Sequence, residues 1–143
     1  YADSFNYLSD SDDLQTTFQQ VADHLTADGK FLFDMISLYQ TDKVYPGYMY
    51  NYAQPDGREY FMWSSYQNDD VEHGVIHELT FFHQQADHSY QRVEETHFEQ
   101  GYSLDHIRQA LTNAGFNHVK VTADFGQQPV QDDSRRWFFE CTK

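Results

Sequence analysis

The strongest constraint on the fold is a capped amphipathic helix that runs directly into an apolar strand. Apolar residues recur on one face of the predicted helix at spacings of four, three and four, namely Leu14, Phe18, Val21 and Leu25. The polar run 9–13 offers several N-caps and places negative charge at the positive end of the helix dipole. We expect Asp28 and Gly29 to end this helix, with Gly29 left-handed. Residues 31–35 then form a nearly continuous apolar run, which is typical of a strand buried on both faces.

The C-terminal part of the chain also alternates between helix and strand. Ser103 is the predicted N-cap of a second helix, whose buried face carries Leu104, Ile107, Ala110, Leu111 and Ala114. We expect Gly115 to end that helix and Phe116 to pack back against its last turn. Strands are predicted over residues 119–121 and 137–141.

The middle of the chain contains four strand-like runs separated by turn signals. The runs are residues 48–52, 58–66, 75–83 and 89–99, and the clearest turn is Pro55-Asp56-Gly57. Because short connections join antiparallel neighbours, these runs predict an antiparallel sheet. Alternation places Phe61, Trp63 and Ser65 on one face of the second run, and gives His77 and His97 the inward direction of their apolar neighbours.

Composition excludes several functional classes. The net charge is −14 with only 9 Lys and Arg residues, so a surface that binds nucleic acid or an anionic membrane is not expected. A small neutral or cationic ligand fits this charge better. The single cysteine, Cys141, excludes an internal disulfide and fits a reducing, cytoplasmic location, and its apolar strand context predicts a core residue. No apolar run approaches the roughly 18 residues of a spanning helix.

Five groups of residues, in this order, carry a resemblance to a known family. They are residues 2–8, residues 29–34, the three sheet segments 60–63, 77–82 and 94–97, residues 114–116, and residues 135–139. The ordered set resembles the C-terminal half of bacterial class I S-adenosylmethionine-dependent methyltransferases of the small-molecule type. The resemblance implies an α/β fold, in which residues 1–46 and 103–143 form part of a Rossmann-like sheet. Residues 47–102 would be an inserted antiparallel β-sheet that covers the substrate. Residues 137–141 would run antiparallel to their neighbours in the main sheet.

The resemblance also implies a cofactor, S-adenosylmethionine, and a loop that lines it. In the family this loop follows the fourth strand, and it corresponds here to Asp3, Ser4, Asn6 and Tyr7. The alternative is a polar turn in which Asn6 caps a backbone group. The family's glycine-rich loop has no counterpart in this sequence. We therefore expect the chain alone to bind the cofactor weakly and to be inactive by itself.

Five further residues are candidates for contacting the substrate. His97 or His77 could act as general base, because the ordinary pKa of histidine lies near neutral pH. Trp63 and Tyr66 could wall the substrate pocket, and Arg136 could clamp an acidic substrate. Each has a structural alternative, which is core packing for Trp63, a hydrogen-bonded core position for the histidines, and an ion pair with local carboxylates for Arg136. The histidines show no metal-ligand spacing, so no metal is expected.

Two functions remain open from the sequence. The first is methyl transfer from S-adenosylmethionine to a small-molecule acceptor. The second is a non-catalytic α+β module that binds a ligand or partner and forms a homodimer through its exposed sheet. A glycine-rich loop encoded upstream of residue 1 would favour the enzyme.

Overall fold

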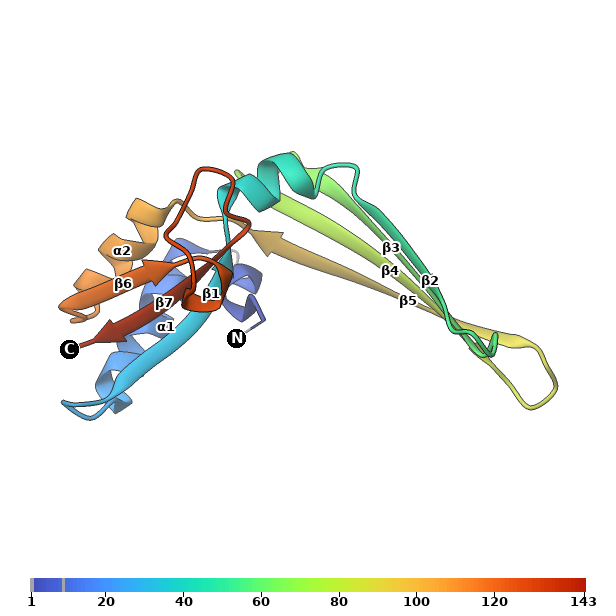
Figure 1. Ribbon diagram of the computed structural model, residues 1–143, viewed down its shortest axis with the longest axis horizontal. Helices are drawn as coiled ribbons and strands as arrows, with labels where there is room; N and C mark the ends of the chain where they lie inside the picture. Colours follow the sequence, from blue (N-terminus) through green and yellow to red (C-terminus); the bar gives the residue numbers. More distant parts are fainter. Residues whose placement is uncertain (1, 9) are drawn as a thin grey trace.

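The computed structural model describes residues 2–8 and 10–143, which form two sheets and two main helices. The three-stranded sheet has the order β1-β7-β6, built from Lys30–Ile36, Arg136–Thr142 and His118–Thr122. The four-stranded sheet has the order β2-β3-β4-β5, built from Met49–Ala53, Glu59–Asn68, Gly74–Gln84 and Tyr90–Gln100. It projects from the rest of the molecule as a long arm (Figure 1). The α/β fold with an antiparallel sheet in its middle is therefore confirmed.

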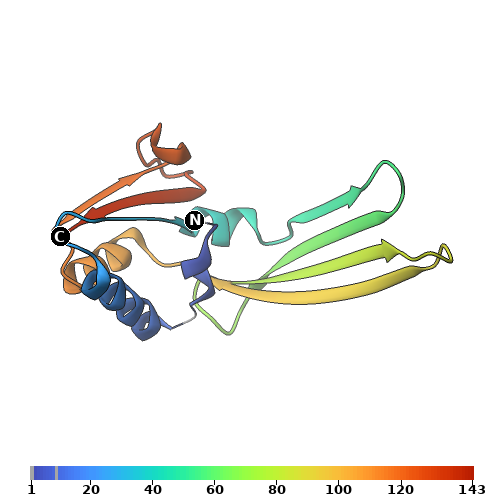
Figure 2. The same ribbon diagram turned by 90° about the horizontal axis from the view of Figure 1, so that it is seen from below.

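The three-stranded sheet has the predicted pairing. The central strand β7 is antiparallel to both β1 and β6, so Phe139 lies opposite Phe33 on one side and Val121 on the other. Helices α1 (Ser11–His24) and α2 (Leu104–Asn113) cover one face of this sheet (Figure 2). None of the helices in the described ranges is long and apolar enough to cross a membrane.

Local signals fix where both helices begin. Asp10 caps α1 by accepting a 2.8 Å hydrogen bond from the backbone N–H of Asp12, and Ser103 caps α2 through the N–H of His106. Ser9, another predicted capping candidate, lies outside the described residues.

The two helices end differently. Gly115 follows α2 and ends it as predicted, and it is left-handed with φ 96°. The N–H groups of Gly115 and Phe116 bond back to Thr112 and Leu111. The corresponding prediction for Gly29 was wrong. Helix α1 ends at His24 with an extended Leu25, and Gly29 is not left-handed. A side chain at Gly29 would approach Leu25 within 2.7 Å, so close packing explains the small residue there.

The main core lies between the two helices and the sheet face that they cover. Leu14 and Phe18 from α1 meet Ile107 and Leu111 from α2, all fully buried. Phe33 and Phe139 stack across β1 and β7 with ring centroids 4.5 Å apart. The opposite face of β1 is only partly covered, since Leu32 is 47% exposed. The prediction that residues 31–35 are buried on both faces is therefore wrong for this position.

The two sheets meet around the buried side chain of Asn6. Asn6 lies in the short 3-10 turn η1 (Ser4–Tyr7), accepts a 2.9 Å hydrogen bond from the N–H of Ile36, and donates a 2.8 Å hydrogen bond to the carbonyl of Gln100. The base of β5 therefore lies beside the carboxyl end of β1. A π-helical turn, η2 (Gln40–Val44), packs against Gly101 so closely that a Cβ there would lie 2.8 Å from Thr41 Oγ1.

Candidate functional site

A cleft of about 280 Å³ lies where η1, the segment after β1 and the four-stranded sheet come together. It is lined by Asp3, Tyr7, Tyr45, Phe61, Trp63, His77, Leu79, His97 and Glu99. The strand registers explain this lining, because Ser65, His77 and His97 lie directly opposite one another, as do Trp63, Leu79 and Glu95. Ligands of open α/β sheets bind outside the carboxyl ends of their strands, and this cleft lies at that end of β1.

His97 lies between two partners at the cleft. Its Nδ1 is 3.0 Å from the hydroxyl of Tyr7, and its Nε2 is 3.0 Å from Oε2 of Glu95. An ionised carboxylate can only accept a hydrogen bond, so this network assigns the ring proton to Nε2. The Tyr7 hydroxyl then donates to Nδ1. Partial burial raises the pKa of Tyr7 to about 12, with the negative charge of Glu99 acting in the same direction, so the phenol is protonated at neutral pH.

His77 has a different environment, although it is the strand neighbour of His97. It is 4% exposed, and its Nδ1 receives the indole N–H of Trp63 at 3.2 Å and lies 2.7 Å from the hydroxyl of Ser65. Because indole N–H can only donate, the ring proton of neutral His77 belongs to Nε2. That atom lies 3.6 Å from Oε2 of Glu99. His77 is thus held inside the sheet, whereas a third of the His97 side chain is exposed.

Arg136 forms an ion-pair bridge at one end of the cleft. Its guanidinium donates to Asp34 of β1 and, at 2.7 Å, to Oδ2 of Asp3. Asp34 is 3% exposed, so its charge is balanced inside the protein by Arg136. The structural alternative for Arg136, an ion pair with local carboxylates, is therefore present. Burial raises the pKa of Asp3 above its ordinary value, against the opposing influence of Arg136.

Of the four residues in the predicted cofactor segment, two line the cleft and two do not. Both side-chain atoms of Asn6 that can form hydrogen bonds are used by the backbone of Ile36 and Gln100, so Asn6 joins the sheets. Ser4 is exposed, and it does not line the cleft. Asp3 and Tyr7 do line the cleft and present a carboxylate and an aromatic ring.

Tyr66 requires a correction. It was expected to share a pocket wall with Trp63, but residues three apart on a strand point to opposite faces. Tyr66 lies opposite Ile76 on the other face of the sheet, is 47% exposed, and does not line the cleft. Trp63 lies in the cleft wall, in edge-on contact with Tyr48.

Three residues at or beside the cleft were missed from the sequence. Glu99 and Glu95 were visible only as alternating members of a strand, and Tyr45 lies just after a π-helical turn that no pattern predicted. The spacing of Glu95, His97 and Glu99 by twos places all three on one face, and that spacing was the available signal.

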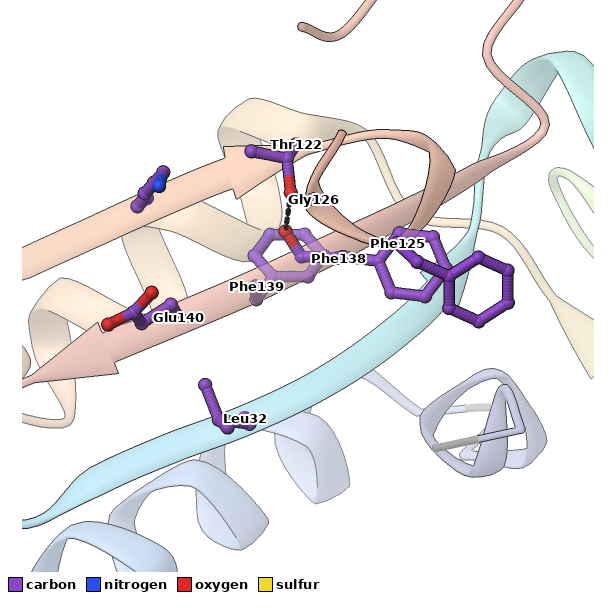
Figure 3. A pocket seen from close by; sticks show the side chains of 8 residues that line it. Leu32, Thr122, Phe125, Gly126, Phe138, Phe139 and Glu140 are labelled. Atoms are coloured by element: carbon purple, nitrogen blue, oxygen red, sulfur yellow. Dashed lines mark hydrogen bonds between the residues drawn. The ribbon is translucent and has the colours of Figure 1, made fainter. Parts of the chain in front are cut away.

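A second cavity, of about 240 Å³, lies on the open face of the three-stranded sheet (Figure 3). Leu32 and Phe138 line it, and the ring of Phe125 packs on Phe138 with centroids 4.5 Å apart. Apart from Lys120 and Glu140, its lining holds no ionisable side chain. It therefore offers less chemistry than the cleft beside His97. Across the described part of the chain, no group of three or more His, Cys, Asp or Glu side chains is placed to hold a metal ion.

Comparison with known proteins gives related sequences along the whole chain. It is 35% identical over 143 residues to a protein of Geobacillus sp. (strain WCH70) named "Putative methyltransferase", covering 100% of this chain and 57% of that protein. It is 33% identical over 141 residues to "Putative methyltransferase YqeM" of Bacillus subtilis, covering 99% and 56%. No family model matches the chain.

A solved structure agrees with these relatives. An S-adenosylmethionine-dependent methyltransferase from Clostridium acetobutylicum superposes with a TM-score of 0.85 at 28% identity, covering 99% of this chain and 55% of that one. The chain thus spans about half the length of the curated relatives that it matches. The resemblance to the C-terminal half of S-adenosylmethionine-dependent methyltransferases is confirmed.

Proposed function

We propose that this chain forms the acceptor-binding half of a cytoplasmic enzyme that transfers a methyl group from S-adenosylmethionine to a small molecule. The observation that carries the proposal is the cleft in which Tyr7, His97 and Glu95 form one hydrogen-bonded series beside aromatic walls. This series has the arrangement of an activated proton acceptor, in which a base is oriented by a carboxylate behind it.

The series provides a path for the proton that an acceptor must lose. An N–H or O–H of the acceptor would donate to the oxygen of Tyr7, whose hydroxyl lies 3.0 Å from Nδ1 of His97 and would donate its own proton there. As the acceptor's proton reaches Tyr7, the Tyr7 proton moves to His97. The imidazolium that results is balanced by Glu95, 3.0 Å from Nε2. His97 then acts through Tyr7, and Tyr7 is the group that touches the acceptor.

The cofactor would lie at the Asp3 and Tyr7 end of the cleft. When bound, S-adenosylmethionine supplies a methyl group on a positively charged sulfur, which needs alignment and exclusion of water more than acid catalysis. The carboxylate of Asp3 and the ring of Tyr7 would face that charge. Trp63 would form part of the wall that excludes water.

The proposal predicts a specific effect of replacing His97. The test uses the complete gene product that contains this chain, assayed for S-adenosylhomocysteine release with a panel of small amines and alcohols. A general base contributes about 10²–10⁴-fold, so His97→Gln should lower kcat by that factor and leave the dissociation constant for S-adenosylmethionine nearly unchanged.

A matched control separates catalysis from stability. His83 lies on the same face of the four-stranded sheet as His97, but it lies beside Glu59 and outside the cleft. His83→Gln should therefore leave kcat unchanged. If His97→Gln lowers only the melting temperature and the rate per folded molecule stays intact, His97 is structural. If the complete gene product neither binds nor consumes S-adenosylmethionine, the methyltransferase proposal fails.

The alternative module also has an observation in its favour. Large apolar side chains are exposed on the outer face of the four-stranded sheet, including Met49 (69%), Met62 (46%) and Phe98 (54%). A homodimer formed through this sheet would cover them. Such a dimer is compatible with either function, because the outer face lies opposite the cleft.

A further inference from the structure

The carboxylate of Glu99 is the unusual feature of the cleft wall. Its side chain is only 6% exposed, and its Oε2 has no hydrogen-bond partner among the described residues. Nε2 of His77 lies 3.6 Å from this oxygen and also has no hydrogen bond among the described residues. A buried carboxylate oxygen without a partner costs free energy unless something else supplies a donor.

The two carboxylates of the cleft differ in how they are balanced. Asp3 is paired with Arg136 at 2.7 Å. Glu99 has no Lys or Arg partner, since the residues that line the cleft include neither, and its ion-pair contact is Nε2 of His77 at the longer distance of 3.6 Å. The remaining walls are largely aromatic, from Tyr7, Tyr45 and Trp63. A carboxylate surrounded by aromatic faces is the environment that proteins use to bind organic cations.

Two neighbouring phenols support a negative potential in this space. Burial raises the pKa of Tyr45 to about 12, and the largest contribution from a charge is that of Glu99. The pKa of Tyr7 is raised to about 12 in the same way, again with Glu99 as the leading charge. The negative charge of Glu99 disfavours a second negative charge on either phenol, and the same charge would attract a cation that entered the cleft.

We infer that the acceptor bound in this cleft is an amine, which enters as an ammonium ion and donates an N–H to Oε2 of Glu99. This inference rests on the proposed function and narrows its substrate class. The ammonium would pass one proton to the oxygen of Tyr7 while the Tyr7 proton moves to Nδ1 of His97. The amine is then neutral, with a free lone pair, and the positive charge lies on His97 beside Glu95.

The binding preference can be measured without methyl transfer. The probes are benzylammonium and its neutral counterpart benzyl alcohol, added to the ¹⁵N-labelled complete gene product. The indole N–H signal of Trp63 reports on the cleft, because that group bonds to His77 beside Glu99. The signal of Trp137, which is 8% exposed in the main core, is the internal control. We expect benzylammonium to shift the Trp63 signal and to bind at least about tenfold more tightly than benzyl alcohol.

Two variants test whether Glu99 is the cause. Glu99→Gln removes the charge with little change of shape and should reduce the affinity for benzylammonium to that for benzyl alcohol. Glu78→Gln removes the same charge from an exposed position on the other face of the sheet and should keep the preference. Equal affinity of the two probes in the unmodified protein would overturn the inference, and so would a preference that survives Glu99→Gln.

The unmodified protein decides the matter even if Glu99→Gln does not fold, because the comparison of the two probes needs no variant. The outcome is also separable from that of the proposed function. A protein that methylates acceptors without preferring the ammonium probe would retain the proposed function and lose this inference. A protein that prefers the ammonium probe but does not use S-adenosylmethionine would lose the proposed function and keep only the binding of organic cations beside Glu99.

Discussion

At the scale of single residues, Asn6 shows how one polar side chain can hold two sheets together. It is fully buried, and its amide satisfies the N–H of Ile36 and the carbonyl of Gln100. These backbone groups belong to different sheets, so the side chain replaces a strand pairing that the topology does not provide. The cleft depends on this joint, because Tyr7 follows Asn6 directly and reaches His97 from there.

Asn6→Ala should therefore destabilise the fold. The substitution leaves the buried N–H of Ile36 and the partly buried carbonyl of Gln100 without their partner. Each unsatisfied group costs about 1–3 kcal/mol, so the free energy of unfolding should fall by about 2–6 kcal/mol. Urea denaturation followed by circular dichroism measures this change. Asn117→Ala, at an exposed position, is the matched control and should change stability by less than about 0.5 kcal/mol. Equal effects of the two variants would show that Asn6 does not join the sheets.

The same scale shows what the sequence could and could not reveal about the site. Alternation along strands placed Trp63, His77 and His97 on inward faces, and the register brings the two histidines opposite each other. The prediction that Tyr66 lines the pocket with Trp63 was wrong, because residues separated by an odd number of positions on a strand point to opposite faces. Glu99 was missed because its burial arises where β5 meets η1, a tertiary contact that no local pattern contains.

At the scale of elements, β7 is the strand on which the three-stranded sheet depends. It pairs along its length with β1 on one side and β6 on the other, and its inward residues Phe139 and Cys141 are buried. The element could be recognised from its aromatic and apolar run. The helices were equally predictable at their N-caps and at Gly115, because those signals are local. The end of α1 was not, because Gly29 is required by packing rather than by backbone conformation.

Cys141 offers a probe of this strand. It is fully buried, and burial raises the pKa of its thiol to about 12. At pH 8 the native thiolate fraction is then on the order of 10⁻⁴, so an aromatic disulfide reagent should label the native protein far more slowly than the chain unfolded in urea. The unfolded thiol ionises at lower pH than the native one, so the free energy of unfolding should fall as the pH rises toward 12. Native labelling as fast as that of the unfolded chain would show that β7 opens readily.

At the scale of the whole molecule, the chain is a helix-covered sheet with a long second sheet that rises from the carboxyl end of its first strand (Figure 1). The two parts meet at the cleft, so the polar series of Tyr7, His97 and Glu95 combines residues from both. The sequence predicted the two sheets and the antiparallel direction of residues 137–141. It could not predict the cleft itself, because that space depends on the angle at which the sheets are joined by Asn6 and η2.

The arrangement predicts that the 143-residue chain by itself binds S-adenosylmethionine weakly or not at all. Among the predicted cofactor residues, Asp3 and Tyr7 alone face the cleft, and they suit the sulfonium end of the molecule. The resemblance implies that the family holds the methionine part with a glycine-rich loop and the ribose with an acidic residue after the second strand, and neither has a counterpart in this sequence. Such polar contacts supply much of the orientation in a ligand site. Isothermal titration calorimetry should therefore detect no tight binding to the isolated chain, whereas the complete gene product should bind. Circular dichroism of the isolated chain is the necessary control, because an unfolded chain would also fail to bind. A folded isolated chain with a micromolar dissociation constant, equivalent to about −8 kcal/mol, would mean that the cofactor site lies within these residues.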